Sequence, residues 1–212
     1  MKLRRIVPLD IENKILIPFA CISLATVLCF CIILYFTEFQ VKVEAERQEA
    51  LAQFGLSINL PKMKTDLERY KIHYDNWFYE SALHESGYVK ETVDLLTERG
   101  WTYEKDGALW LNTTQLLKEK YLREGKTQEQ VDKLDLKDDV LRRANGFYTY
   151  FAADIAYHRN KFAVRGFDRV INIWGADHHG HVARLKGALD ALGLDGTNRL
   201  DIVLMQLVKL LR

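Results

Sequence analysis

The sequence predicts an α/β protein that consists of a partial parallel sheet with a helical insertion, preceded by an N-terminal transmembrane helix. Three observations lead to this fold class. An uncharged apolar run lies at residues 15–36, a strand–helix–strand pattern fills residues 169–208, and two short strands flank a helical stretch between residues 108 and 143.

Composition narrows the function classes before any motif is considered. The 212 residues contain 30 Lys+Arg and 29 Asp+Glu, a formal charge of +1, which excludes a strongly basic nucleic-acid coat and an acidic disordered tail. Apolar residues make up 48%, enough to bury a core. All three cysteines, Cys21, Cys29 and Cys31, lie in the apolar run, so the rest of the chain has no disulfide framework or cysteine-based zinc site.

Residues 15–36 form the predicted membrane span. At 1.5 Å per helical residue they extend about 33 Å, which is enough to cross a bilayer core. A secretory signal peptide is the alternative, but the run is long for one and no small-residue cleavage pattern follows it. Residues 1–14 are a basic flank, and acidic residues dominate after the span. The positive-inside rule therefore predicts a single-pass anchor with a cytosolic N-terminus, which would send the remaining chain outside.

Residues 37–58 are expected to form a juxtamembrane helix and linker. They are polar with scattered Val, Leu and Phe, and Gly55 is expected to end the helix. Composition changes again near Pro61. We therefore place a boundary at about residue 58, with the soluble body at residues 59–212.

The soluble body begins with an amphipathic helix. Ser86 is a candidate N-cap, and Val89, Val93 and Leu96 recur at helical spacing on one face. Gly100 is expected to stop this helix.

Two short strands are predicted next, at residues 108–111 and 140–143. Between them, residues 115–139 read as a helical excursion in which Thr127 and Gln130 match a capping box. We expect this excursion to be a surface insertion.

The clearest unit comes last. After a helix at residues 150–162, it comprises a buried strand at 169–174, a tight turn at 175–178, a helix at 182–192 and a second apolar strand at 200–208. Strand, helix and strand with short links predict a right-handed βαβ unit of a parallel sheet. Ligands bind such sheets at the carboxyl ends of the strands, where the sequence GADHHGH lies.

The densest polar cluster is in that turn, at Asp177, His178, His179 and His181. Metal binding, as in a metal-dependent hydrolase, is one reading, but consecutive histidines do not easily face one ion and no HExxH motif or cysteine partner is present. A second reading is phosphate binding at the N-terminus of the following helix. A third is that these are only polar caps on a strand-to-helix turn, and spacing alone leaves this open.

Tyr150 and Asp154 are one helical turn apart and can face the same cleft. A carboxylate accepts the two parallel N–H donors of a guanidinium, so the pair suits a bound arginine-like group. The alternative is an intrahelical surface pair with Arg159 or Lys161. Pattern alone thus reaches an α/β nucleotide-binding-like domain.

A family resemblance goes further. The sequences DDVLRRANGFYTYFAADIAYHRNKF (138–162) and FDRVINIWGADHHGHVARLKGALDALGL (167–194) closely resemble bacterial arginyl-tRNA synthetase, and the similarity covers about residues 61–212. Residues 1–58 do not resemble that family and look like the membrane anchor of a bacterial signalling protein.

The resemblance implies a class I synthetase catalytic domain of Rossmann type, which is cytoplasmic, activates arginine with Mg²⁺ and ATP, and transfers it to tRNA. It implies that Tyr150 and Asp154 hold arginine. The residues implied near ATP or the adenylate are Gly175, Asp177, His178 and His179, with His181 less strongly indicated and Gln206 placed beside the adenine.

The sequence also departs from the family. Class I synthetases use a HIGH-type motif and a KMSKS-type loop to stabilise charge on the phosphates. HHGH at 178–181 fits the letters of the first motif, but its neighbours match a later segment of the family, and the chain ends where the second would follow. We therefore expect a truncated arginine–tRNA ligase that is inactive by itself, with no catalytic residue or metal site assigned. The alternative is a membrane-anchored arginine-binding or signalling protein that uses a degenerate synthetase domain.

Overall fold

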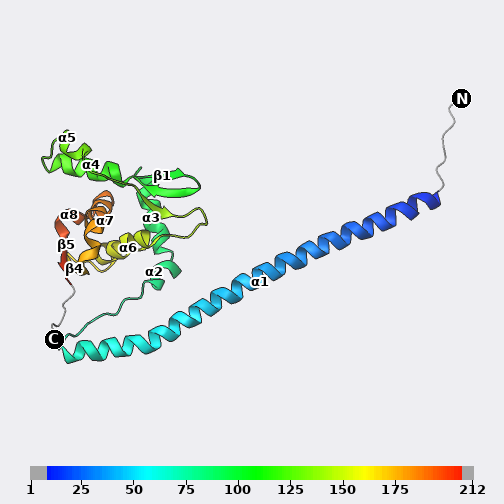
Figure 1. The fold of residues 1–212 in the computed structure, drawn as a ribbon, viewed down its shortest axis with the longest axis horizontal. Helices are drawn as coiled ribbons and strands as arrows, with labels where there is room; N and C mark the ends of the chain where they lie inside the picture. The colour runs from blue at the N-terminus through cyan, green and yellow to red at the C-terminus, as the bar shows by residue number, and fades with distance from the viewer. Residues whose placement is uncertain (1–8, 207–212) are drawn as a thin grey trace. The chain divides into compact units, whose positions relative to one another are not determined.

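The computed structural model describes residues 9–206, with side chains described from residue 26 onward. The chain divides into two units, Met1–Asn76 and Trp77–Arg212 (Figure 1).

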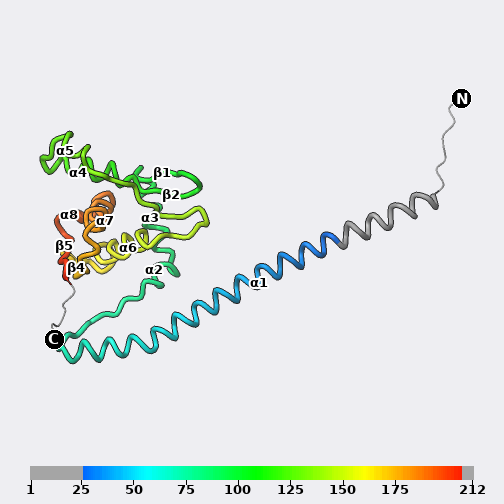
Figure 2. Tube along the Cα trace, in the orientation of Figure 1, coloured from blue at the N-terminus to red at the C-terminus, as the bar shows by residue number. Residues whose placement is uncertain are grey.

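The first unit contains one long helix, α1 (Leu9–Arg69), whose coloured part Figure 2 traces as one continuous coil. The predicted span at residues 15–36 lies inside it. From Thr26 onward the helix is long and apolar enough to cross a membrane, judged by length and composition, and none of its apolar window is buried. The prediction of a helix here is therefore confirmed.

The predicted end of this helix at Gly55 is wrong, because α1 continues through Gly55 and Pro61 to Arg69. A single glycine costs a helix only about 1 kcal/mol relative to alanine, which good helix formers on both sides can offset. The helix ends where Lys71 adopts a left-handed backbone with φ of 57°. The Ile72 N–H then donates to the Leu67 carbonyl at 3.0 Å, a 6→1 bond that closes the helix end.

The second unit alternates short helices and strands. Its elements in chain order are α2 (Ser81–Glu85), α3 (Tyr88–Glu98), β1 (Thr102–Lys105), β2 (Ala108–Leu111), α4 (Thr113–Arg123), α5 (Gln128–Asp132), β3 (Asp139–Arg142), α6 (Tyr150–Arg159), the π-helical turn η1 (Asn160–Val164), β4 (Val170–Gly175), the 3₁₀ turn η2 (Ala176–His178), α7 (His179–Ala191), α8 (Gly196–Arg199) and β5 (Leu200–Met205). The mixture of helix and sheet expected from the sequence is confirmed.

The first amphipathic helix, α3, buries Val89, Val93 and Leu96 as predicted. Its predicted N-cap is wrong: the Ser86 hydroxyl donates back to the Ala82 carbonyl at 2.7 Å, in the turn that ends α2. Gly87, with φ of 74°, occupies the N-cap position, since two helices this close need a left-handed residue between them.

Strands β1, β2 and β3 form an antiparallel sheet in that order. The predictions for β2 and β3 are confirmed, with β3 beginning one residue earlier than expected. Strand β1 was not predicted. It pairs with β2 through a hairpin whose turn, Asp106–Gly107, has φ of 53° and 73°, and Asp-Gly is the residue pair that such tight hairpin turns favour.

The helical insertion contains α4 and α5, and its capping box at Thr127 and Gln130 is confirmed. The expectation that it lies only on the surface is wrong. Leu116 and Leu117 of α4 are buried, and α4 packs against α7. Gly187 of α7 faces this contact, where a β-carbon would lie 3.4 Å from the Leu117 side chain, an ordinary van der Waals distance.

The predicted strand–turn–helix–strand unit is confirmed. Strands β4 and β5 are parallel, with partners running from Val170 and Leu200 to Gly175 and Met205, and η2 and α7 connect them. The end expected at residue 208 lies outside the described residues. The carboxyl ends of both strands therefore meet at Gly175 and Met205.

The core of this unit surrounds α6. Leucine and isoleucine residues with no exposed surface come from six elements: Leu96, Leu111, Leu141, Ile155, Leu185, Leu189 and Leu200. Helix α6 contributes a nearly continuous buried stretch from Phe151 to Ala156. Because apolar residues cover most sides of α6, any polar side chain on it needs an internal partner.

Candidate functional site

The carboxylate of Asp154 lies at the contact between α6 and α7. Its Oδ2 accepts a hydrogen bond from Nε2 of His181 at 2.6 Å, and the two side chains are only 12% and 14% exposed. The rings of Phe151 and Trp174 lie 5.1 and 5.5 Å from the His181 ring. Asp154 thus faces the segment that carries the GADHHGH sequence, and not open solvent.

Tyr150 lies one turn before Asp154, at the start of α6. This residue is 65% exposed. The negative charge of Asp154 raises the pKa of Tyr150, with smaller contributions from partial burial and from Glu80. The phenol therefore stays neutral at physiological pH and remains able to donate a hydrogen bond near the carboxylate.

The alternative of an intrahelical ion pair is wrong. Arg159 pairs instead with Glu91 of α3 at 2.6 Å, and the Lys161 amine donates to the Asn172 side chain at 3.2 Å. Asp154 is left with His181 as its charged or polar side-chain partner among the described residues within 3.5 Å.

A second polar chain lies beneath Asp154. His158 Nδ1 contacts the Asp154 carbonyl oxygen at 2.7 Å, and Asn172 Nδ2 contacts His158 Nε2 at 2.6 Å. Because a carbonyl only accepts and an amide nitrogen only donates, this assigns His158 as the neutral tautomer protonated on Nδ1. Lys161 completes the chain by donating to Asn172.

Burial governs the protonation of this chain. It lowers the pKa of His158 to about 4, and the charge of Lys161 adds to the effect. Burial also lowers the pKa of Lys161 to about 8, against the opposing pull of Asp154. His158 is therefore neutral at pH 7, in agreement with its hydrogen bonds.

The carboxyl ends of β4 and β5 line a hollow of about 470 Å³. Gly175, Ala176, Asp177, Met205 and Gln206 surround it. Three of the residues expected near ATP, Gly175, Asp177 and Gln206, are therefore brought together although 31 positions separate the first from the last. This is the edge at which parallel sheets bind ligands.

The two neighbouring histidines do not line that hollow. His178 is exposed, with its ring 5.7 Å from Trp174 and its Nε2 3.8 Å from the Asp177 carboxylate. His179 instead lines a different hollow of about 630 Å³ between α7, α4 and residues 134–137. The structure thus separates the histidines that the sequence places side by side.

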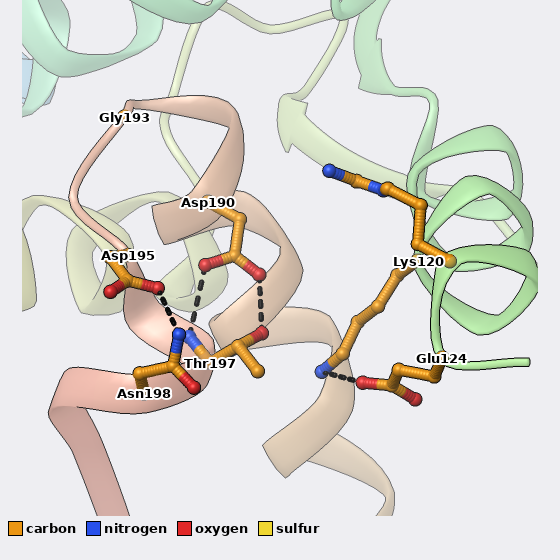
Figure 3. A pocket seen from close by; sticks show the side chains of 8 residues that line it. Lys120, Glu124, Asp190, Gly193, Asp195, Thr197 and Asn198 are labelled. Atoms are coloured by element: carbon orange, nitrogen blue, oxygen red, sulfur yellow. Dashed lines mark hydrogen bonds and ion pairs between the residues drawn. The ribbon is translucent and has the colours of Figure 1, made fainter.

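Among residues 26–206, no group of three or more His, Cys, Asp or Glu side chains is arranged to hold a metal ion. A further hollow of about 430 Å³ lies between α4 and the α7–α8 connection (Figure 3). Its polar groups already satisfy one another: Asp190 accepts from the Thr197 hydroxyl at 2.5 Å, and Lys120 pairs with Glu124 at 3.7 Å. We assign it no role.

Sequence reasoning missed the roles of His158, Asn172 and Trp174, and it considered Lys161 only as a possible surface partner of Asp154. The signal for Asn172 was present, because it is a polar residue inside the otherwise apolar strand RVINIW and needs a buried partner. Trp174 directly precedes the GADHH turn and lies within 6.2 Å of three histidine rings, those of His158, His178 and His181. No sequence pattern joined it to them.

Comparison with known proteins identifies close relatives, although no family model matches the sequence. The arginine–tRNA ligase of Caldanaerobacter subterraneus subsp. tengcongensis is 56% identical over 166 residues, covering 78% of this chain and 26% of that protein. That of Carboxydothermus hydrogenoformans is 55% identical over 167 residues, covering 79% and 27%. The chain therefore spans about a quarter of the length of these relatives.

The comparison with solved structures identifies the same kind of protein. The crystal structure of a protein assigned as an arginyl-tRNA synthetase from Campylobacter jejuni has a TM-score of 0.61 and 37% identity, covering 74% of this chain and 30% of that one. Arginyl-tRNA synthetase from Plasmodium falciparum, at 16% identity, shares the fold alone, with a TM-score of 0.52 over 71% of this chain and 23% of that one.

The match with these relatives extends into α1. A match of 166 residues leaves at most 46 of the 212 outside it, so it begins at or before residue 47. The matched region therefore includes at least residues 47–69 of α1 and begins upstream of the boundary expected near residue 58. The homologues of this part of the chain are arginine–tRNA ligases, which are aminoacyl-tRNA synthetases.

Proposed function

We propose that this homologue of the arginine–tRNA ligases binds arginine at Asp154 and Tyr150, beside an ATP site at the carboxyl ends of β4 and β5. The observation that carries this proposal is the free acceptor of a buried carboxylate. Oδ2 of Asp154 is held by His181, whereas Oδ1 accepts no hydrogen bond from residues 26–206.

The chemistry of Asp154 selects a cationic ligand. A largely buried carboxylate is costly unless charge or hydrogen bonds compensate it, and a single imidazole hydrogen bond to one of its two oxygens leaves the other oxygen without a donor. A guanidinium supplies two parallel N–H donors and a full positive charge. The neutral phenol of Tyr150, on the exposed side of the same helix turn, can donate to a further acceptor of the ligand.

The hollow at Gly175, Asp177 and Gln206 is the proposed nucleotide site, and His178 and His179 are retained as adenylate contacts on the family resemblance alone. The N-terminus of α7, a helix of 13 residues, carries the positive end of the helix dipole, which favours the negative charge of phosphates. The parallel strands β4 and β5 would then be part of a Rossmann-type sheet. ATP would arrive as its Mg²⁺ complex, a substrate, and tRNA would be the acceptor of the activated arginine.

We further propose that this chain, by itself, does not complete the reaction. Arginine activation builds negative charge on the phosphates, and the sequence holds neither a HIGH-type motif in the family's position nor a KMSKS-type loop to stabilise it. Arginine-dependent exchange of pyrophosphate into ATP, measured on the purified full chain, is expected to stay at background. Exchange above background that depends on Asp154 would refute this.

Arginine binding tests the site directly. Isothermal titration calorimetry of the full chain in detergent is expected to detect arginine and to detect none in Asp154→Asn, which removes the charge and keeps the shape. Asp94→Asn, in an exposed pair with Lys90 on α3, is the matched control and should bind like the wild type. Equal binding by Asp154→Asn and the control would rule out this site.

We also propose that α1 anchors the chain to a membrane through residues 15–36. Its support is the long apolar helix with no buried residue in its apolar window. Membranes from expressing cells, washed with alkaline carbonate, should retain the chain, and release into the supernatant would contradict the anchor. Protease added to intact cells then tests the orientation of the anchor. If the second unit uses ATP and tRNA, it must lie inside the cell and be protected from the protease. If the charge bias around the span sets the orientation, the second unit lies outside and is digested.

Arginine binding without pyrophosphate exchange would fit the alternative function of a membrane-anchored arginine-binding or signalling protein. The observation that favours it is the union of the apolar helix with a carboxylate that is free to accept a cation.

A further inference from the structure

Two histidines contact different parts of Asp154: one binds its side-chain carboxylate and the other its backbone carbonyl. His181, from α7, binds the carboxylate through Oδ2 at 2.6 Å. His158, from the next turn of α6, binds the backbone carbonyl at 2.7 Å and leaves the carboxylate at 3.8 Å. The orientation of the carboxylate therefore depends on His181.

The orientation of the His181 ring is itself constrained. Phe151 meets it edge to face at 5.1 Å, and Trp174 lies tilted against it at 5.5 Å. Only 14% of the His181 side chain is exposed. An aromatic enclosure of this kind restricts the ring to few rotamers, so the Nε2–H donor is fixed before any ligand arrives.

The second polar chain fixes the helix turn below. His158 is fully enclosed at 1% exposure, and Asn172 of β4 and Lys161 of the π-helical turn extend its hydrogen bonds. Asp154 cannot move along α6 without breaking these bonds. What remains adjustable is rotation of the carboxylate about its own side-chain bonds, and the bond from His181 removes that freedom.

We infer that His181 is a positioning residue for arginine, which binds one oxygen of Asp154 so that the other is presented to the guanidinium. This inference rests on the proposed arginine site. His181 makes no contact with the ligand in this assignment and acts through Asp154. Fixing a ligand-binding carboxylate in advance removes the cost of ordering it when the ligand binds.

The start of α7 would serve both the arginine site and the nucleotide site. His181 is in the first turn of α7, three residues after the turn η2 that carries Asp177. The same helix start thus lies beside the proposed phosphates and holds the carboxylate for the amino acid. Both substrates would be located by one element.

The test measures arginine and citrulline binding to the full chain by calorimetry. Citrulline has the shape of arginine without its positive charge. His181→Phe, which fills the aromatic enclosure but has no donor, should weaken arginine binding about 10- to 100-fold, the range for losing a hydrogen bond to a charged group. His181→Gln, which restores an N–H donor, should recover at least about half of that loss on a logarithmic scale. His84→Gln, on the exposed face of α2, is the control.

Discrimination between the two ligands separates positioning from packing. Loss of a positioned carboxylate reduces the preference for arginine over citrulline, whereas general loosening weakens both ligands alike. An unchanged preference in His181→Phe, or arginine affinity within about threefold of the wild type, overturns the inference and leaves the arginine site in place. Absence of arginine binding to the wild-type chain overturns the site itself and, with it, the role of His181.

Discussion

Gly196 lies against Leu189 so closely that a β-carbon on the glycine would come within 2.5 Å of the Leu189 β-carbon and 2.9 Å of the Lys186 carbonyl oxygen. Leu189 is fully buried on α7, and Gly196 begins α8, the short helix that leads into β5. The missing side chain therefore lets the chain fold back tightly enough to bring β5 beside β4. Backbone and buried atoms on the opposite side cannot easily move away.

Gly196→Ala is therefore expected to destabilise the second unit by about 1–3 kcal/mol, the usual cost of overpacking a core. Urea unfolding of the full chain, followed by tryptophan fluorescence, measures this. All four tryptophans lie in the second unit, so the signal reports on it alone.

Gly180→Ala is the matched control. Gly180 lies in α7 with nothing within 4 Å of an added β-carbon, so alanine should raise stability by up to about 1 kcal/mol through its better helix propensity. A similar loss in both variants would show that close packing at Gly196 is not the cause.

Asp139 and Arg184 are expected to be coupled. The Asp139 carboxylate, 12% exposed, binds Arg184 through Oδ1 and the Thr113 hydroxyl at 2.9 Å through Oδ2, joining β3, α4 and α7. A double-mutant cycle with Asp139→Asn and Arg184→Gln should give a coupling free energy of about 1 kcal/mol, moderated by the partial exposure of Arg184. The exposed pair of Lys90 and Asp94 should give about 0.3–0.5 kcal/mol. Equal coupling in the two cycles would contradict the structural role.

Local sequence signals predicted the fold where one residue pattern decides the structure. The buried run of β4 and the turn at Gly175 leave few alternatives, and both are confirmed. The predicted end of α1 was wrong because a single glycine such as Gly55 stops a helix only weakly. The helix ends before Lys71, whose left-handed backbone conformation is uncommon for lysine and is not indicated by the sequence. The packing of α4 on α7 brings Leu117 beside Gly187, 70 positions later in the chain, and no local pattern holds that information.

For the candidate site, spacing on one helix predicted that Tyr150 and Asp154 share a face, and sheet topology predicted that the GADHHGH segment lies at the carboxyl ends of the strands. Both follow from regular geometry, whereas Gln206 was indicated by the family resemblance alone. The partner of Asp154 could not be predicted this way. His181 lies 27 residues later on another helix, and which of the clustered histidines faces inward depends on where η2 ends and α7 begins.

Acid should destabilise the second unit through His158. The pKa of this group falls from 6.5 to about 4 in the folded state because of burial. The unfolded chain therefore binds more protons between these values, so stability is full above about pH 6.5 and falls as the pH is lowered toward 4, by up to about 3 kcal/mol. Urea unfolding at several pH values measures the slope. His158→Gln, although less stable at pH 7, should lose this part of the slope, whereas the exposed His84→Gln should keep it. An identical slope in His158→Gln would refute the assignment.

The nucleotide hollow is expected to depend on the small size of Gly175. Its φ of −66° suits any residue, but a β-carbon there would overlap the Asp177 carboxylate. Asp177 is exposed, so it should swing away rather than strain the fold, and stability should change by less than about 0.5 kcal/mol. Because the displaced side chain reshapes the hollow, Gly175→Ala should weaken Mg–ATP binding about tenfold while arginine binding stays unchanged, as measured by calorimetry. Ile173→Val, on the same strand and 73% exposed, should leave both affinities unaltered. Unchanged ATP binding in Gly175→Ala would rule out this hollow as the nucleotide site, because a displaced Asp177 carboxylate would change the shape and charge that a bound nucleotide contacts.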